Sequence, residues 1–236
     1  MIAIIAILAA LLLPALAEAK AHARQVQCTS NLRQVSLALR MWVEASEISA
    51  FPWRVRVSDG GTQPDSGLKS ANAAHEFLTI SNELDTPKLL LCPADRKKRA
   101  ASNFGSSIDG GLANPAFRDN AVSYFISLDA GTRIYNGSAV VAFAEAQNQA
   151  VLGDDDFRVD VQPGSGGTCS AGVNVPATVL TQPLTGNLAF TNRIHKSGGN
   201  IAFGDGSVRF TRSSDLGRVM IETDDSGNGR VHLLMP

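Results

Sequence analysis

Hydrophobic and polar positions change character twice along this chain. From Met1 to Ala17 the sequence is an unbroken apolar run, which as a helix rising 1.5 Å per residue would be about 25 Å long. That length approaches the bilayer hydrocarbon core of about 30 Å. From Glu18 the chain becomes amphipathic, and its apolar residues line one helix face at Cys28, Leu32, Val35, Leu39 and Trp42. The pattern predicts one long helix over residues 1–48, apolar at its start and one-sided after that.

Residues 49–236 show the short apolar runs and turn signals that are typical of a β-rich domain. No glycine occurs before Gly60. The clearest hairpin is Asn200–Thr211, where Asp-Gly lies between two alternating runs. Further strands are predicted at Ala121–Leu128, Ser138–Ala144, Val151–Leu152 and Val231–Met235, a short helix at Ser70–Leu84, and loops at Gly153–Asp156 and Gln162–Gly172. The predicted fold class is α+β, with a long N-terminal helix packed on an antiparallel β-sheet.

The apolar start has three interpretations. Ala15-Leu16-Ala17 is a small-x-small site of the kind that ends a signal peptide, but no basic region precedes the run. A plain membrane anchor is the second interpretation, although the basic residues that follow the run would favour keeping the rest of the chain on the inner side of the membrane. The third is that the true start lies upstream, so that a basic leader and the first helix residues precede Met1.

Five segments carry a resemblance to a known family. They are the helix IAIIAILAALLLPALAEAKAHARQVQCTSNLRQVSLALRMW, the stretch LCPAD (Leu91–Asp95), NAVSYFISLDA (Asn120–Ala130), the closing RVHLLMP, and His195 followed after nine residues by Asp205-Gly206. Together they resemble type IV pilin-like proteins and type II secretion pseudopilins, in particular the planctomycete and verrucomicrobial prepilin-type proteins with a C-terminal H-x9-DG motif. The glycine, first aromatic residue and glutamate that open the family's helix are not in this sequence.

The resemblance implies a pilin-like fold and a structural role without enzymatic activity. It implies a subunit of a type IV pilus-like or pseudopilus fibre, held before assembly in the inner membrane by a single-pass helix with a periplasmic or extracellular C-terminal domain. The implied partners are copies of the chain or related pseudopilins, the membrane and the assembly machinery. Pro14 matches the family's helix proline, which removes a backbone hydrogen bond and bends the helix.

His195 and Asp205 are the first candidates for chemistry. Imidazole and carboxylate suit either metal ligation or acid/base catalysis. The structural interpretation is favoured, because Asp205 and Gly206 occupy a hairpin turn in which the carboxylate bonds local N–H groups. His195 is then expected to bond the turn or the sheet edge. Neither Ser207 nor Cys169 has the sequence context of a nucleophile.

The three cysteines, Cys28, Cys92 and Cys169, lack metal-ligand spacing. In an exported domain they allow one disulfide and one free thiol, with Cys28 and Cys92 the preferred pair. The alternative is three small buried residues.

Calcium is the one cofactor considered. Asp224, Ser226 and Asn228 place side-chain oxygens at alternate positions before a glycine, like the first half of a calcium loop, but the complete EF-hand pattern is absent. A solvated turn explains the same residues, and Asp154–Asp156 is a second acidic cluster. No other cofactor is expected.

Composition limits the remaining functions. The formal net charge is −1, which gives no electrostatic basis for binding nucleic acid. An alternative to the fibre subunit is an exported or anchored β-domain that binds a ligand such as a polysaccharide. An exposed groove lined by Trp53, Tyr124 or Tyr135 would favour that alternative. An exported hydrolase is a third hypothesis.

Overall fold

A computed structural model describes residues 2–64, 72–108, 110–135, 138–159, 167–168, 174–175, 178–181, 188–223 and 230–236. Its helices are α1 (Ile2–Ala45), α2 (Ala73–Thr79) and α3 (Ser213–Ile221). Short 3-10 helices are η1 (Pro52–Arg54), η2 (Val57–Asp59), η3 (Pro87–Leu90), η4 (Arg118–Asn120) and η5 (Phe143–Ala146). The strands are β1 (Tyr124–Ser127), β2 (Thr132–Tyr135), β3 (Ser138–Val141), β4 (Ala150–Asp154), β5 (Phe157–Val159), β6 (Gly167–Thr168), β7 (Asn174–Val175), β8 (Thr178–Thr181), β9 (Leu188–Phe190), β10 (Gly198–Phe203), β11 (Val208–Arg212) and β12 (Arg230–Leu234).

A six-stranded antiparallel sheet forms the centre of the domain. Its strand order is β11-β10-β4-β1-β12-β8, and each neighbouring pair runs antiparallel. Three two-stranded ribbons, β2-β3, β5-β9 and β6-β7, accompany it. The long N-terminal helix and this sheet confirm the predicted α+β class.

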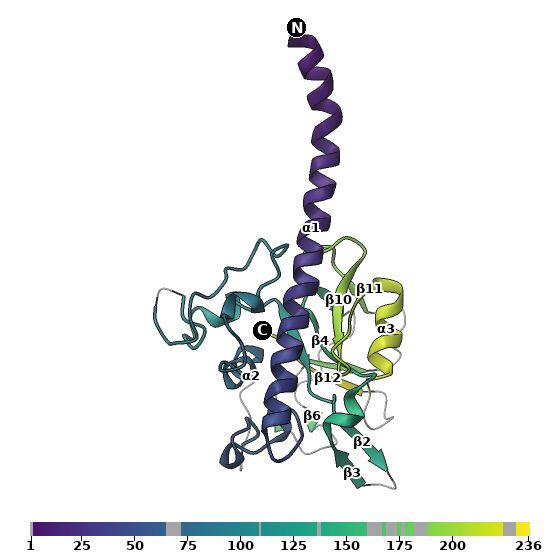
Figure 1. Cartoon of the computed structure of the whole chain (residues 1–236). Coiled ribbons are helices and arrows are strands. Elements are labelled where there is room, and N and C mark those ends of the chain that lie inside the picture. The colour runs from purple at the N-terminus through teal and green to yellow at the C-terminus, as the bar shows by residue number, and fades with distance from the viewer. Residues whose placement is uncertain are drawn as a thin grey trace.

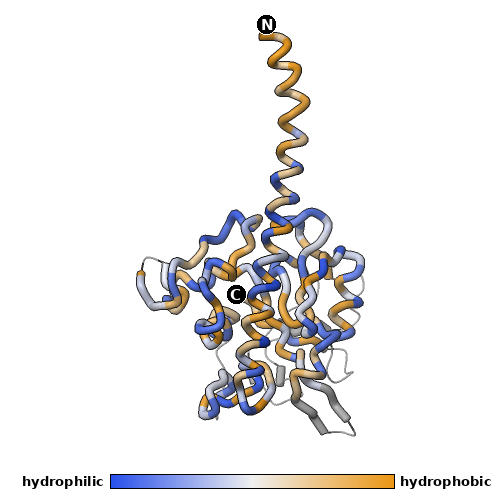
Figure 2. The backbone as a smooth tube through the Cα atoms, in the orientation of Figure 1, coloured by the Kyte–Doolittle hydropathy of each residue, from blue (hydrophilic) through white to orange (hydrophobic). Residues whose placement is uncertain are grey.

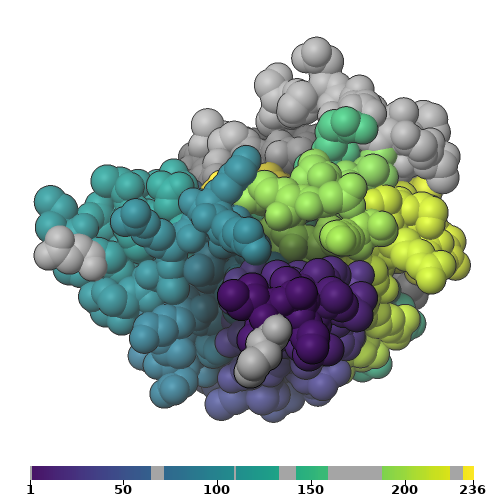
Figure 3. Space-filling model, turned by 90° about the horizontal axis from the view of Figure 1, so that it is seen from above, coloured from purple at the N-terminus to yellow at the C-terminus, as the bar shows by residue number. Residues whose placement is uncertain are grey.

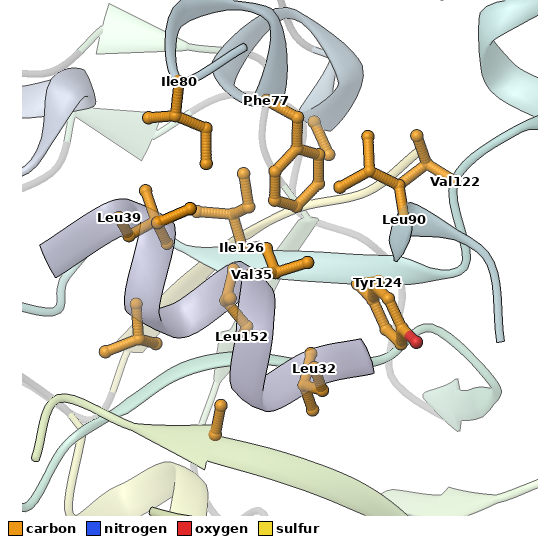
Figure 4. Packing of buried hydrophobic residues seen from close by; sticks show 14 of the residues in the cluster. Leu32, Val35, Leu39, Phe77, Ile80, Leu90, Val122, Tyr124, Ile126 and Leu152 are labelled. Carbon is orange, nitrogen blue, oxygen red and sulfur yellow. The ribbon is translucent and has the colours of Figure 1, made fainter. Parts of the chain in front are cut away.

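The two faces of the sheet are covered by different helices, as Figure 1 shows. Because successive strand residues point to opposite faces, Tyr124 and Ile126 of β1 join the hydrophobic cluster that contains Leu39 of α1. Phe125, between them, joins a second cluster that contains Leu216 of α3. The C-terminal half of α1 is therefore part of the domain core, and Figure 4 shows its side chains packed between the sheet, α2 and η3.

The predicted long helix is present from Ile2 to Ala45 and continues unbroken through Pro14. Most of the predicted stripe is buried, but Trp42 is only partly covered. The N-terminal half leaves the domain and projects alone, with the N-terminus at its far end (Figure 1).

The Asn200–Thr211 hairpin is confirmed as β10 and β11, with Gly198 paired to Arg212 at its open end. The strands predicted around Phe125, Leu152 and Leu233 are also present, with bounds that differ by one to a few residues.

Two expectations of local structure were wrong over part of their length. The predicted loop at Gly153–Asp156 begins inside β4, because Gly153 makes room for the Phe125 ring, which would lie 2.5 Å from an added Cβ. The strand predicted through Ala144 ends at Val141 and gives way to η5. The helix α3 was not predicted.

Candidate functional site

The first candidate surface is the free half of α1, which comprises the exposed residues 2–23 that project from the domain. Its large apolar side chains are exposed, for example Leu11 with 72% of its surface accessible. Figure 2 colours the helix near its N-terminus almost uniformly as hydrophobic, whereas hydrophobic and hydrophilic residues are mixed along the chain of the domain. Helix α1 is long and apolar enough to cross a membrane, and none of its most apolar part is buried. These properties are consistent with a single-pass membrane anchor, because lipid or protein must cover such a surface.

A disulfide and several side-chain hydrogen bonds join the domain to α1. A disulfide links Cys28 of the helix to Cys92, which is the pair preferred from the sequence. Beside it, Asn31 Nδ2 donates to the Leu91 carbonyl at 3.1 Å. Two turns further along, Arg40 Nη1 donates to the Asp205 carbonyl at 3.0 Å. The helix therefore cannot slide along the domain without breaking a covalent bond.

His195 lies under the same helix. It is buried, with Nε2 3.1 Å from Asn200 Nδ2, 3.5 Å from Cys92 Sγ and 3.5 Å from Asp154 Oδ2. Burial lowers the pKa of His195, outweighing the charge of Asp156. A neutral ring that accepts from the Asn200 amide at Nε2 fits this environment.

Asp154 is the most perturbed acid of this buried region. Burial raises its pKa from 3.8 to about 7, although two hydrogen bonds from Asn200 act in the opposite direction. Those bonds come from the Asn200 backbone N–H at 2.6 Å and its Nδ2 at 3.0 Å. Burial, followed by the charge of Asp154, also raises the pKa of Tyr124 well above its ordinary value. Such perturbation occurs in catalytic sites and in buried polar networks alike.

Arg193 gathers the remaining carboxylates. Its guanidinium contacts Asp95 at 3.1 Å, Asp155 at 2.8 Å and Asp156 at 3.2 Å. Lys98 pairs with Asp155 at 2.5 Å. The acidic cluster at 154–156 is therefore occupied by internal cations and backbone donors, which leaves it poorly suited to calcium.

The H-x9-DG residues serve different parts of the structure. Asp205 lies in the β10-β11 turn, where its Oδ1 accepts from the Ser207 N–H at 2.8 Å. Its pKa is lowered, because hydrogen bonds from Ser207 outweigh the effect of burial. Gly206 has a φ of +82°, which favours glycine. Among the described contacts none joins His195 to Asp205.

Potential metal ligands also meet beside α1. The sulfurs of Cys28 and Cys92 lie within 4.8 Å of a His195 ring nitrogen and of each other, but in the disulfide they are not thiolates and do not offer the charge that a metal requires. The proposed calcium residues Asp224, Ser226 and Asn228, and Cys169, lie outside the described residues.

Two of the three aromatic residues considered for a ligand groove do not line an exposed one. Trp53 and Tyr124 are fully buried, and the side chain of Tyr135 lies outside the described part. Trp53 and Tyr124 therefore give no support to the ligand-binding alternative, and Tyr135 leaves it untested.

Three residues of the buried network were not anticipated as partners from the sequence, namely Arg193, Asp154 and Asn200. A further pair was missed between two of the resembling segments: His232 Nδ1 lies 3.0 Å from Asp129 Oδ1, and both residues are buried. The available signal was the presence of ionisable residues inside or beside apolar strands, where burial requires a partner.

Comparison with known proteins adds no relative: no protein-family model matches the chain, and no curated protein and no solved structure is significantly similar to it.

Proposed function

We propose that this chain is a pilin-like structural subunit of a type IV pilus-like or type II pseudopilus fibre. Before assembly it is anchored in the inner membrane by the free half of α1, with its domain in the periplasm or outside the cell. Its partners are further copies or related pseudopilins and the assembly machinery, and its role is not enzymatic. The observation that supports this is a single helix that is exposed and apolar in one half and part of a folded α+β core in the other.

The two halves of α1 suit a subunit that changes surroundings. In a bilayer the exposed leucines and isoleucines are covered by lipid, and in a fibre by the same surface of neighbouring copies. Transfer between the two exchanges one apolar environment for another, so it does not expose that area to water. The disulfide and the Arg40 contact transmit force on the helix to the domain.

Paired leucine variants in α1 test the proposal. Leu11 lies in the free half, whereas Leu37 lies in the domain-bound half but is also exposed, with 56% of its surface accessible. A charge near the centre of a membrane helix costs about 3 kcal/mol. We expect Leu11→Asp to weaken retention in carbonate-washed membranes and to remove the chain from shear-released polymers, while Leu37→Asp remains in the membrane.

The experiment uses cells of the source organism with the chain expressed from its own locus. If the parent chain stays in the membrane and never enters a shear-released polymer while a fibre is being made, the fibre proposal is wrong and the anchor stands. If Leu11→Asp and the parent are extracted equally, the anchor is wrong as well.

A further inference from the structure

A cavity of about 620 Å³ opens beside α1 where the helix leaves the domain. Helix residues from Ala17 to Gln25 form one wall, and loop residues around Arg96 and from Asn192 to Lys196 form the others. Figure 3 looks down the helix onto this face, where a hollow lies between the purple helix and the neighbouring blue-green and yellow-green segments.

Most of the charged residues that line the cavity are cationic. Arg24, Arg96 and Lys196 line it together with His22, and Glu18 is the one acid among the lining residues. Within the described part of the chain, Arg24, Arg96 and Lys196 have no ion-pair partner, whereas Arg193, which also lines the cavity, is neutralised by three aspartates. Charges of one sign in a concave site attract an anion.

The height of the cavity restricts what that anion can be. Its wall starts at Ala17, the last residue of the apolar run, and extends for about 12 Å along the helix axis. If the apolar run occupies the hydrocarbon core, the cavity begins at the headgroup layer, which is about 5–8 Å thick on each side. Ala21 and Ala94 add an apolar wall beside the basic groups.

We infer that this cavity binds the phosphate of an anionic phospholipid from the leaflet next to the domain. Arg24, Arg96 and Lys196 neutralise the phosphate, and the alanine wall accommodates its glycerol and first methylene groups. Bound lipid would fix the height and orientation of the domain above the bilayer. The inference rests on the proposed membrane anchor but not on fibre formation.

The test uses the full chain in neutral detergent micelles, titrated with fluorescent phosphatidylglycerol or phosphatidylcholine. Each basic residue near an anionic surface contributes about 1 kcal/mol, which corresponds to about a fivefold change in affinity. We expect phosphatidylglycerol to bind at least tenfold more tightly than phosphatidylcholine. The Arg96→Ala and Lys196→Ala variants should each weaken that binding about fivefold, and the double variant more than tenfold.

Lys97→Ala is the matched control. It removes the same charge at the position next to Arg96, but the Lys97 side chain does not line the cavity. If it weakens binding as much as Arg96→Ala, the attraction is diffuse and the cavity assignment is wrong. Equal binding of the two lipids also overturns the inference.

Inorganic phosphate, compared with chloride at equal ionic strength, separates a lipid from a soluble anion. Displacement of the lipid by phosphate at a similar concentration would overturn the lipid assignment in favour of a soluble phosphate ligand. Carbonate resistance in pure phosphatidylcholine vesicles measures the anchor independently. A chain that inserts there but shows no preference for phosphatidylglycerol contradicts only the cavity proposal.

Discussion

Truncation of Leu39 tests whether the C-terminal half of α1 belongs to the domain core. Leu39 is 1% exposed and packs in the cluster formed by the helix, the sheet and α2. Leu39→Ala removes three carbon atoms, whose transfer from water is worth about 0.8 kcal/mol each. The remaining cavity adds a further cost, so the expected total is about 3 kcal/mol, within the range measured for buried leucines.

Leu37→Ala provides the control, because Leu37 lies on the same helix with 56% of its surface exposed. We expect this variant to change the free energy of unfolding by less than about 0.5 kcal/mol. Both are compared with the parent by urea unfolding in the same neutral detergent, with tryptophan fluorescence as the signal. Trp53 is buried and belongs to the same core cluster as Leu39.

Two results would contradict this prediction. If Leu39→Ala unfolds at the same urea concentration as the parent, α1 does not contribute to the domain core. If Leu37→Ala is equally destabilised, the cost comes from helix propensity or detergent contacts and not from burial. Leu39→Asp extends the series, since a buried unpaired charge should prevent folding altogether.

Four further outcomes are expected. Asp154 has a raised native pKa of about 7, so its contribution to stability is greatest below about pH 4 and falls as the pH rises towards 7, by on the order of 4 kcal/mol. Asp154→Asn should remove that decline. If the difference in stability between this variant and the parent does not change with pH, the prediction is wrong. The Cys28–Cys92 disulfide joins residues that are 64 positions apart, so its reduction should lower the free energy of unfolding by about 4 kcal/mol. Cys169→Ser in the oxidised chain should have little effect. Equal melting temperatures of the oxidised and reduced parent would argue against the bond. Gly206→Val should destabilise the β10-β11 turn by about 1 kcal/mol or more, and Gly206→Asn by less, because asparagine tolerates positive φ. EDTA should leave the parent's melting temperature unchanged. If EDTA lowers the melting temperature of the parent but not that of His195→Ala, His195 belongs to a metal site.

Local sequence patterns were sufficient to predict the elements whose apolar residues recur with a strong periodicity. The uninterrupted apolar run and the following one-sided stripe predicted a single helix, and α1 spans Ile2–Ala45. The alternation on both sides of Asp205-Gly206 predicted the β10-β11 hairpin. Both features depend on contacts between residues close in sequence, so the pattern that encodes them lies within one short window.

The loop predicted at Gly153–Asp156 failed because a run of aspartates is locally polar. In the folded chain Asp154 continues β4 and is bonded by Asn200, 46 residues away. Only the order of strands in the sheet places these two residues together, and the local preferences of an acidic run do not identify Asn200 as the partner.

The candidate sites depend even more on the tertiary structure. The sequence placed Asp205 in a hairpin turn and His195 near that turn or the sheet edge, but it did not identify their partners. His195 contacts Asn200, while Asp205 contacts Ser207 and Arg40 of α1. The basic cavity combines helix residues with loops more than 70 and 160 positions further along. Sequence pattern alone established that an apolar helix begins the chain and that a β-rich domain follows. Which charges gather where the helix leaves that domain depends on tertiary packing, because burial and ion pairing follow distance in space and not separation along the chain.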